Sequence, residues 1–536
     1  LAAAVRPDAQ DTFNANMHGN FHTSVQATEH SHRAHVHMAE FYNAASDREI
    51  VFGPNMTTLT FQMARVLGPR FQEGDEIITT HMEHEGNNWP WRTMAAERGL
   101  VVKTVPFDRD TYELDLDAFA DMITERTRFA AINVASNLLG TINPVKQMVA
   151  ALRDVGAITY LDAVQYAPHG VIDVQDLGCD FLVASSYKFY GPHQGILYGR
   201  EELLSSLPAY KLRTVPDITP DRYETGTQSL EGQSGVIGAL EYVQWVGREF
   251  GRDLRPPTPG LSERTRDLQA GMKAMVAYEE TLSERLVSGL QSIPGVRIHG
   301  ITDRAAFSRR VPTVSITAPG LDPAELASFL DTKGVYVWNG HSYALPVVEF
   351  LGIADQGGVV RIGPTHYNTV DEIDRCVGLI EQFLTSRATS ASRRERRRPD
   401  VLAHRAHRPA CPALVVRACD PPGDVDGRGL ETLEVSVDGA LPGADAYTLD
   451  ERALTIPLGG ERHEVRTVVA VRPGGAGDKG VAYRPRLIST NCEPEGFRRI
   501  TWAIDRPSNR STYDVTLVAD PAEFRTLLAN GMQVET

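Results

Sequence analysis

One lysine stands in a setting that could change its chemistry. Lys188 lies in the segment SSYKFYGPHQG, directly after the run CDFLVA. Consecutive apolar residues are typical of a short buried strand, so we expect this lysine to follow the end of a strand. An ammonium group partly removed from water loses proton affinity, and such a lysine can act as a free amine that forms a Schiff base. The competing interpretation is an exposed loop lysine, which is the ordinary setting of this residue.

A carboxylate follows a second apolar run, 26 positions upstream of the lysine. Asp162 ends the stretch AITYLD. A carboxylate buried at a strand end costs free energy unless a cation or several donors satisfy it. A protonated pyridine nitrogen is such a cation, and Gln165 could donate to an oxygen on the same ring. The alternative is an aspartate that caps a helix. The spacing between Asp162 and Lys188 matches one strand–helix–strand crossover, which brings both side chains to the same edge of a sheet.

The elements that must position these residues alternate along the chain. Strand patterns separated by helical segments occur up to about residue 255, at DEIITT, VVKTVPF, FAAINVAS, ITYLDAV and FLVASS. This alternation predicts an α/β fold with a mostly parallel sheet wrapped by helices. A long amphipathic pattern over 262–292 leads to the strand patterns GVRIHG, TVSITA, YVWNG and VVRIG. These predict a smaller α+β domain.

Five segments in combination resemble the class V aminotransferase family of fold type I pyridoxal 5′-phosphate (PLP) enzymes, and cysteine desulfurases most of all. They are SNLLGTINPV at 136–145, YLDAVQYAPHG at 160–170, SSYKFYGPHQGILYGR at 185–200, YETGTQ at 223–228 and VVRIGPTHYNT at 359–369. The resemblance runs from about residue 14 to 384. It implies a large PLP-binding domain with a seven-stranded sheet over 46–260 and a small α+β domain over 261–385. It also implies that residues 1–45 complete the small domain and the active-site entrance.

The resemblance assigns roles around the cofactor ring. Lys188 would bind PLP covalently and move protons at the substrate Cα, and Asp162 would keep the ring nitrogen protonated. Gln165 and Asn137 would face the ring oxygen, and His84 would stack on the ring. A protonated ring is the electron sink that stabilises a carbanion at Cα. Without the family, His84 is more simply a packed histidine.

The expected phosphate site has no P-loop pattern, because GPNMTTL at 53–59 lacks the GKT lysine. The segment begins a helix, whose free amides attract anions, and the hydroxyls of Thr57 and Thr58 add donors. The resemblance adds Ser185 and Tyr187, the latter where most relatives have histidine. It also implies that Thr227 reaches the phosphate of a second subunit, so we expect an obligate homodimer. Ordinary caps and turns are the alternative for these hydroxyls.

The residues expected to bind the substrate match the family at one position and differ from it at another. Arg361 suits bidentate capture of a carboxylate, and the family uses the matching arginine for an α-carboxylate, so we expect an amino-acid substrate rather than a structural ion pair. A desulfurase also needs a nucleophilic cysteine in the preceding loop. That loop reads VWNGHSYALP, with Tyr343 at the cysteine position and Trp338 where desulfurases have arginine. His341 and Tyr343 are candidates for substrate contacts and proton transfer.

The function expected from these residues is PLP-dependent bond breaking at Cα or Cβ of an amino acid. We rank β-elimination of the C–S lyase type first, because it keeps the first steps of a desulfurase without the acceptor cysteine. Transamination, epimerisation and decarboxylation are the alternatives within the family. A non-catalytic scaffold that keeps the fold is the alternative from a different class.

Composition predicts an ordinary soluble protein. The 536 residues suffice for at least two domains, and a net charge of −15 argues against nucleic-acid binding. No apolar stretch reaches the roughly 18 residues of a membrane span. Five scattered cysteines predict a reducing compartment, so we expect a cytoplasmic protein. The chain begins at Leu1 rather than methionine, which predicts that it lacks its native beginning.

A group of histidines early in the chain invites a metal-site interpretation. His30, His32, His35 and His37 lie in EHSHRAHVH. Histidines at such spacing can bind a metal. Residues 24–44 also have a helical pattern, on which His30 and His37 share a face and the other two lie elsewhere. We therefore expect no metal, and favour a solvated helix over substrate-side contacts.

The C-terminal part of the chain has a different texture. Residues 386–410 are rich in Arg, Ser, Ala and His and include RRERRR at 393–398, which predicts a basic flexible linker. Residues 411–536 lie outside the resemblance and predict a β-rich accessory domain of unknown role, with a helix at 521–529. Its strand patterns are LEVSV, ALTIPL, EVRTVVAV, RPRLIST, RITWAI and YDVTLVA.

Overall fold

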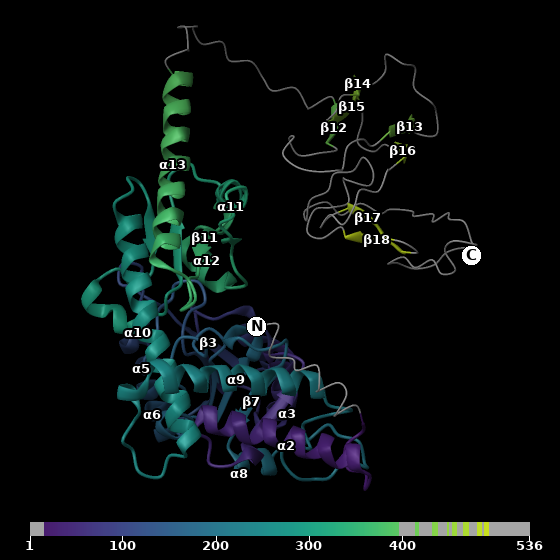
Figure 1. Cartoon of the computed structure of the whole chain (residues 1–536), viewed down its shortest axis with the longest axis vertical. Coiled ribbons are helices and arrows are strands. Elements are labelled where there is room, and N and C mark those ends of the chain that lie inside the picture. The colour runs from purple at the N-terminus through teal and green to yellow at the C-terminus, as the bar shows by residue number, and fades with distance from the viewer. Residues whose placement is uncertain are drawn as a thin grey trace. The chain divides into compact units, whose positions relative to one another are not determined.

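The computed structural model describes residues 15–395 and seven strands between residues 413 and 491, with side chains described for residues 15–386. The chain divides into two compact units, Leu1–Arg398 and Pro399–Thr536 (Figure 1).

A seven-stranded sheet forms the centre of the first unit, in the order β1-β7-β6-β5-β4-β2-β3. Strand β7 runs antiparallel to both of its neighbours, and the other pairs are parallel. This confirms the predicted mostly parallel sheet. The strands are β1 (Ile50–Gly53), β2 (Glu76–Thr80), β3 (Val101–Val105), β4 (Thr127–Asn133), β5 (Ile158–Asp162), β6 (Phe181–Ser185) and β7 (Gly195–Gly199).

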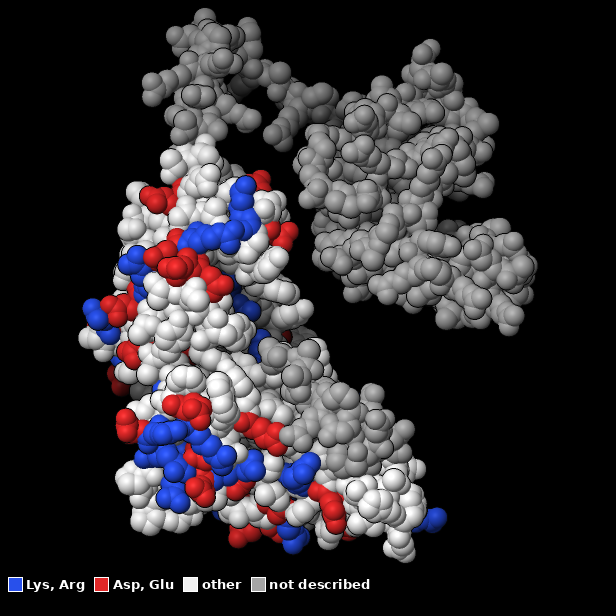
Figure 2. All heavy atoms as spheres, viewed as in Figure 1, with Lys and Arg blue, Asp and Glu red and all other residues white. Residues whose placement is uncertain are grey.

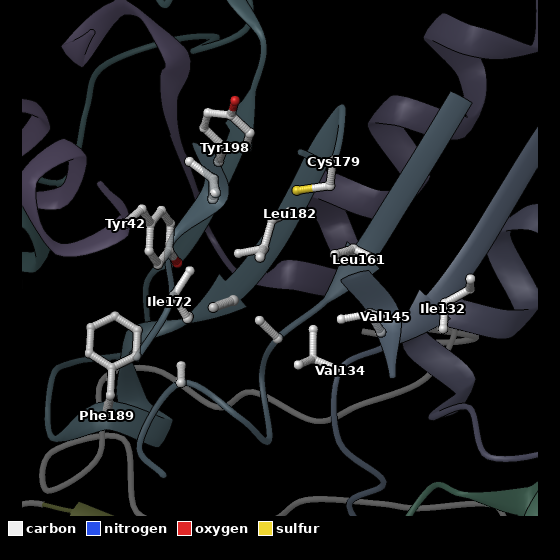
Figure 3. Close-up of a cluster of buried hydrophobic side chains, with 14 of the residues drawn as sticks. Tyr42, Ile132, Val134, Val145, Leu161, Ile172, Cys179, Leu182, Phe189 and Tyr198 are labelled. Carbon is white, nitrogen blue, oxygen red and sulfur yellow. The ribbon is translucent and has the colours of Figure 1, made fainter. Parts of the chain in front are cut away.

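Helices cover both faces of this sheet. Successive residues of β6 point to opposite faces, so Leu182 joins one hydrophobic core and Phe181 joins the other. Figure 3 shows Leu182 and Leu161 of neighbouring strands in the first core, with Phe189 nearby. Burial on both faces explains the continuous apolar runs in the sequence. The helices are α3 (Met56–Leu67), α4 (Glu85–Arg98), α5 (Leu116–Met122), α6 (Val145–Asp154), α7 (Val174–Leu177), α8 (Glu201–Ser206) and α9 (Leu230–Phe250), with short 3-10 turns η1 (Asp47–Glu49), η2 (Gly68–Arg70), η3 (Ser186–Phe189) and η4 (Arg252–Leu254).

Helix α2 (His22–Tyr42) lies beside α9 and packs in the core of the large domain (Figure 1). Met38, Phe41 and Tyr42 are buried there, and the rings of Phe41 and Phe189 are 5.3 Å apart. The prediction that this N-terminal segment completes the small domain is therefore wrong for α2, because its apolar face meets α9 instead. Residues 1–14 lie outside the described part of the chain.

A smaller antiparallel sheet follows, in the order β10-β11-β9-β8. Helix α10 (Glu263–Gln291) joins the two domains, since Met272 lies in the large-domain core and Leu286 lies in the small-domain core. The predicted α/β sheet with a small α+β domain is thus observed. The remaining elements are β8 (Arg297–His299), β9 (Val314–Thr317), β10 (Trp338–Gly340), β11 (Val359–Ile362), α11 (Pro323–Asp331), α12 (Leu345–Leu351), α13 (Val370–Glu395), η5 (Arg304–Arg309) and η6 (Ala354–Gln356).

The last helix of the first unit runs further than expected. The predicted linker begins at residue 386, whereas α13 continues to Glu395. The segment contains alanine, arginine and glutamate, which favour helix, and its first proline is Pro399. The linker boundary is therefore corrected to a point after Glu395, and residues 396–410 lie outside the described residues.

Within its described residues, the second unit has three small antiparallel sheets, β12-β15-β14, β13-β16 and β17-β18. Four of the six predicted strand patterns coincide with β13, β15, β16 and β18. The patterns RITWAI and YDVTLVA and the helix predicted at 521–529 lie outside the described residues. The strands are β12 (Ala413–Arg417), β13 (Glu431–Val437), β14 (Thr448–Leu449), β15 (Ala453–Pro457), β16 (Val465–Ala470), β17 (Gly480–Arg484) and β18 (Leu487–Asn491).

The described surface mixes charges of both signs. Figure 2 shows Lys and Arg side chains interspersed with Asp and Glu on the visible face of the first unit. Within the described residues, no helix is both long and apolar enough to span a bilayer.

Candidate active site

The turn that carries Lys188 is closed by hydrogen bonds. Strand β6 ends at Ser185, and the 3-10 turn η3 closes with the amide of Gly191 donating to the Ser186 carbonyl at 2.8 Å. The Ser186 hydroxyl donates to the Pro192 carbonyl at 2.6 Å. Tyr190 ends the turn in the left-handed region, with φ of 73°. The lysine therefore follows a buried strand, as the sequence predicts, on a turn that these two hydrogen bonds hold.

Lys188 and Asp162 lie at the same edge of the sheet. Asp162 ends β5, which pairs in parallel with β6 in a register that aligns Asp162 with Val183. Burial lowers the pKa of Lys188, as does the charge of Arg361, while Asp162 opposes the shift. The two side chains thus interact electrostatically, and the expected convergence is observed.

Asp162 is suited to a cationic partner. Burial raises its pKa to about 6, against the hydrogen bond from the Val164 amide and the charge of Lys188. The Val164 amide, at 2.9 Å, is the one hydrogen-bond donor to this carboxylate from the described residues. A buried carboxylate with spare acceptor capacity fits a protonated ring nitrogen, which would stabilise its charged form.

His84 is held as a neutral imidazole. Its Nδ1 accepts the Gly86 amide at 2.9 Å, so His84 caps α4 as well as facing the site. Burial lowers its pKa to about 4, helped by the charges of Lys188, Arg361 and His341. A neutral ring without a charge to solvate is suited to stacking on another ring. The capping role was not foreseen from the sequence.

The two amides predicted to face the ring oxygen are buried. Asn137 Nδ2 donates to the Ser342 carbonyl at 2.8 Å, and its Oδ1 is buried without a hydrogen-bond partner among the described residues. Gln165 Nε2 donates to Thr313 Oγ1 at 3.0 Å. A buried unpaired polar atom costs free energy, so the Asn137 oxygen marks a place where a ligand donor fits.

The N-terminus of α3 is brought tightly against the sheet edge. Ser185 Oγ accepts the Met56 amide at 3.1 Å, and Asn55 caps the helix by accepting the Thr58 amide at 2.9 Å. A Cβ on Gly195 would lie 2.4 Å from the carbonyl carbon of Asn55, so only glycine permits this approach. Free amides at a helix N-terminus suit a phosphate.

The residues predicted to bind the cofactor phosphate differ in their exposure and in their neighbours. Thr57 is half-buried, and a Cβ on Gly86 would lie 2.9 Å from its hydroxyl, so Thr57 lies next to the start of α4. Thr58 is exposed on the first turn of α3. Tyr187 is partly exposed, with its ring stacked on His193 at 5.1 Å and 5.6 Å from the Lys188 ammonium. Thr227 is exposed in the loop before α9.

Arg361 joins the small domain to the site. Its Nη1 donates to the Asn137 carbonyl at 3.0 Å, which places the guanidinium beside a predicted cofactor residue. Burial lowers the pKa of Arg361. The guanidinium nevertheless remains charged at neutral pH and can bind a carboxylate.

The loop between β10 and α12 is hydrogen-bonded to the large domain. Ser342 and Tyr343 both have left-handed backbones, with φ of 49° and 58°. Two such residues in sequence are strained, and they persist because neighbours hold them. The Ser342 carbonyl accepts from Asn137, and the Tyr343 carbonyl accepts from the Glu85 amide at 2.8 Å. Tyr343 thereby places its ring 5.7 Å from that of His84 and 5.9 Å from that of His341.

One buried acid beside the site was missed. Glu83 precedes His84, and burial raises its pKa to about 8 against three hydrogen bonds. These come from Asn87 Nδ2 at 2.8 Å, the Asn133 amide at 2.9 Å and Thr80 Oγ1 at 2.8 Å. The available signal was a carboxylate next to a candidate ring-stacking histidine at the end of a strand pattern.

The histidine-rich helix is not solvated as predicted. His30, His35 and His37 are buried, and His32 is exposed and 3.1 Å from Asp47. His35 Nε2 lies 2.8 Å from Glu224 Oε1, and both side chains are buried. The prediction fails because α9 and the loop at Glu224 cover this helix. Among the described residues, no group of three or more His, Cys, Asp or Glu side chains could hold a metal ion.

Comparisons with known proteins agree with this geometry. The family model described as "Aminotransferase class-V" matches residues 7–252 and 260–376. A cysteine desulfurase from Pectobacterium carotovorum subsp. carotovorum is 33% identical over 384 residues, which cover 69% of this chain and 86% of that protein. A cysteine desulfurase from Serratia proteamaculans is 32% identical over 384 residues, with the same coverage.

Solved structures match the same part of the chain. The apo structure of a cysteine desulfurase from Thermococcus onnurineus NA1 superimposes with a TM-score of 0.62 at 29% identity, covering 72% of this chain and 92% of that one. The cysteine desulfurase CsdA of Escherichia coli, in an S-sulfonic acid form, gives a TM-score of 0.60 at 25% identity, covering 71% and 91%.

Proposed function

This chain belongs to the class V aminotransferase family and is homologous to cysteine desulfurases, and from that premise we propose that it is a PLP-dependent enzyme that breaks a bond at Cα or Cβ of an amino acid. Enzymes of this family use PLP. When bound, PLP supplies an electron sink for a negative charge that develops at the substrate Cα. The single observation that carries the proposal is the placement of the half-buried Lys188 and the buried Asp162 at one sheet edge.

The residues around this pair fit the cofactor. Asp162 would accept from the ring nitrogen, and His84 would stack on the ring as a neutral imidazole. Asn137 Oδ1, buried without a partner among the described residues, and Gln165 would meet polar ring substituents. The phosphate would bind at the N-terminus of α3, at Thr57, Thr58, Ser185 and Tyr187.

Lys188 and Arg361 would handle the substrate. Because burial and Arg361 lower the pKa of Lys188, a larger fraction of its amine is neutral near pH 7 and can accept a proton from Cα. Arg361 would hold the α-carboxylate in a bidentate pair. Because Arg361 would hold the α-carboxylate, the substrate Cα would lie close to Lys188, which favours α-amino acids as substrates.

The loop residue Tyr343 limits the choice of reaction. We place Tyr343 where desulfurases carry the acceptor cysteine, and the loop 337–346 contains no cysteine. Cys179 and Cys376 are buried, and burial raises the pKa of both thiols. Transfer of sulfur to a protein thiolate in this loop is therefore not proposed, and β-elimination with release of a thiol is the favoured reaction.

Transamination or epimerisation is the second candidate. Tyr343 and His341 lie close to His84, which gives the site proton-carrying groups besides Lys188. Such groups could return a proton to the substrate instead of expelling a leaving group. A scaffold without turnover remains the alternative from another class, and it predicts no response to any amino acid.

The proposal of a homodimer rests on Thr227. It is exposed in the loop before α9, so it can extend toward another molecule. We propose a homodimer in which Thr227 contacts the partner's cofactor phosphate. Light scattering with and without PLP measures the subunit number directly, and a monomer at all concentrations would contradict the dimer.

The function is tested by incubating the PLP-loaded protein with α-amino acids and S-substituted cysteines. Pyruvate together with a free thiol is the expected result. Stoichiometric formation of keto acid with the amine form of the cofactor would instead favour transamination. Absence of any product with every substrate would favour the scaffold.

A further inference from the structure

Trp338 lies next to the residue proposed to bind the substrate carboxylate. Strands β10 and β11 are antiparallel, and their register pairs Trp338 directly with Arg361. Directly paired residues project from the same face of a sheet, so the indole lies beside the guanidinium. Trp338 is nevertheless 55% exposed, although an apolar side chain of this size is normally covered.

Tyr343 forms a second aromatic face near the same place. It is 60% exposed, and its ring contacts those of His84 and His341. Arg361 donates to the Asn137 carbonyl at 3.0 Å, and the Asn137 side chain donates to the Ser342 carbonyl at 2.8 Å. The residue paired with Trp338 and the residue before Tyr343 therefore contact the same asparagine, which brings the two aromatic side chains to one region of the site.

The backbone that carries Tyr343 is held in place by the large domain. The left-handed backbone at Ser342 and Tyr343 is held by hydrogen bonds from Asn137 and Glu85. Aromatic side chains have only two rotatable side-chain bonds, so little entropy is lost when they bind a ligand. A preorganised aromatic wall favours a ligand group that is flat and apolar.

The charges around Trp338 and Tyr343 decide whether a cationic or an uncharged flat group is preferred. An aromatic face attracts cations as well as other rings. The register that pairs Trp338 with Arg361 already places a positive charge beside the indole, so the local field disfavours a second cation. Glu85 is half-buried, and its carboxylate accepts from Asn88 at 3.0 Å. An uncharged aromatic group is therefore preferred over a cationic one.

We propose that Trp338 and Tyr343 form the side-chain subsite of this enzyme, which selects α-amino acids that carry a flat, uncharged aromatic group, with Trp338 as the specificity-determining residue. The proposal rests on the proposed function, because Arg361 must hold the α-carboxylate. It names a substrate class for which the elimination substrate would be an S-aryl or S-arylmethyl cysteine.

The test compares equilibrium binding of L-phenylalanine and L-alanine to the PLP-loaded full chain, followed by tryptophan fluorescence and by the visible absorbance of the cofactor. We expect L-phenylalanine to bind about tenfold more tightly, which corresponds to about 1.4 kcal/mol. Trp338→Ala should abolish most of this ratio by raising the Kd of L-phenylalanine more than that of L-alanine. Trp338→Phe should retain it, because a flat ring remains.

Trp245 provides a matched control. It is 51% exposed on α9, and its ring contacts Tyr242 and Phe250 rather than the site. Trp245→Ala should therefore keep the ratio of the two dissociation constants. If the protein takes up PLP but binds both amino acids equally, the subsite proposal is wrong and the proposed function stands. A protein that takes up no PLP would overturn the proposed function and the subsite with it. A Trp338→Ala variant that changes subunit number but not the ratio would also overturn the subsite.

Discussion

Glu279 ties the two domains of the first unit together, and its removal should destabilise that unit strongly. The carboxylate lies in α10 and is 2% exposed. Its Oε2 is 2.8 Å from Nδ1 of His169, which follows β5 in the large domain. Its Oε1 accepts the amide of His366 at 3.0 Å, in the small domain after β11. One buried side chain thus joins elements of both domains.

The expected loss in free energy of unfolding follows from the two groups that Glu279→Ala would leave without a partner. His169 would lose a buried ion-pair partner, and the His366 amide would lose its acceptor. Breaking a buried pair by removing one partner costs about 3–5 kcal/mol, so the free energy of unfolding should fall by this amount. Glu279→Gln should cost less, because its amide oxygen can still accept from His366.

Urea unfolding followed by tryptophan fluorescence measures this loss, with Glu280→Ala as the control. Glu280 is the next residue of α10 and is exposed, so its removal should change the free energy of unfolding by at most about 0.5 kcal/mol. Burial opposes the charged form of Glu279, but the charge and hydrogen bond of His169 prevail and lower its pKa. Its contribution is therefore present above the unfolded pKa of roughly 4.3 and is lost as pH falls through the lower folded value. Equal losses for Glu279→Ala and Glu280→Ala would refute the reasoning.

Three further predictions concern the site and its support. Asp162→Asn should retain PLP but lose roughly 100-fold in kcat, because an amide cannot stabilise a protonated ring as a carboxylate does; unchanged kcat would contradict its role. Gly195→Ala should weaken PLP binding in equilibrium dialysis, because its Cβ would meet the Asn55 backbone, whereas Gly378→Ala has open space and should not. Burial opposes the charged form of His35, but the nearby Glu224 carboxylate raises its pKa. Its stabilisation should be full below about pH 6.5 and lost as pH rises through the folded value, so His35→Gln should lack this part of the pH dependence of urea unfolding.

The strand ends of the large domain were predictable because their signals are local. Phe181 to Ala184 form a continuous apolar run, and Asp162 and Lys188 each follow such a run. A strand buried on both faces leaves this trace in the sequence whatever packs against it. The same reasoning located the long helix α10 and the strands of the small domain.

Contacts between distant segments could not be predicted in this way. His35 and Glu224 are separated by 189 positions, and nothing near His35 indicates a buried acid partner. The docking of α2 on α9 depends on the shapes of two surfaces that the helical period alone does not specify. The left-handed backbone of Ser342 and Tyr343 likewise results from tertiary hydrogen bonds rather than from residue preference.

The central claim is that Lys188 binds PLP through its amino group. Borohydride reduction of the PLP-loaded protein, followed by peptide mass spectrometry, tests it most directly because it locates the modified lysine without any turnover. We predict the cofactor adduct on Lys188, loss of the visible absorbance band in Lys188→Ala, and no stoichiometric adduct on the exposed Lys146. A protein that stays colourless with added PLP, or an adduct that persists elsewhere at full stoichiometry in Lys188→Ala, would contradict the account.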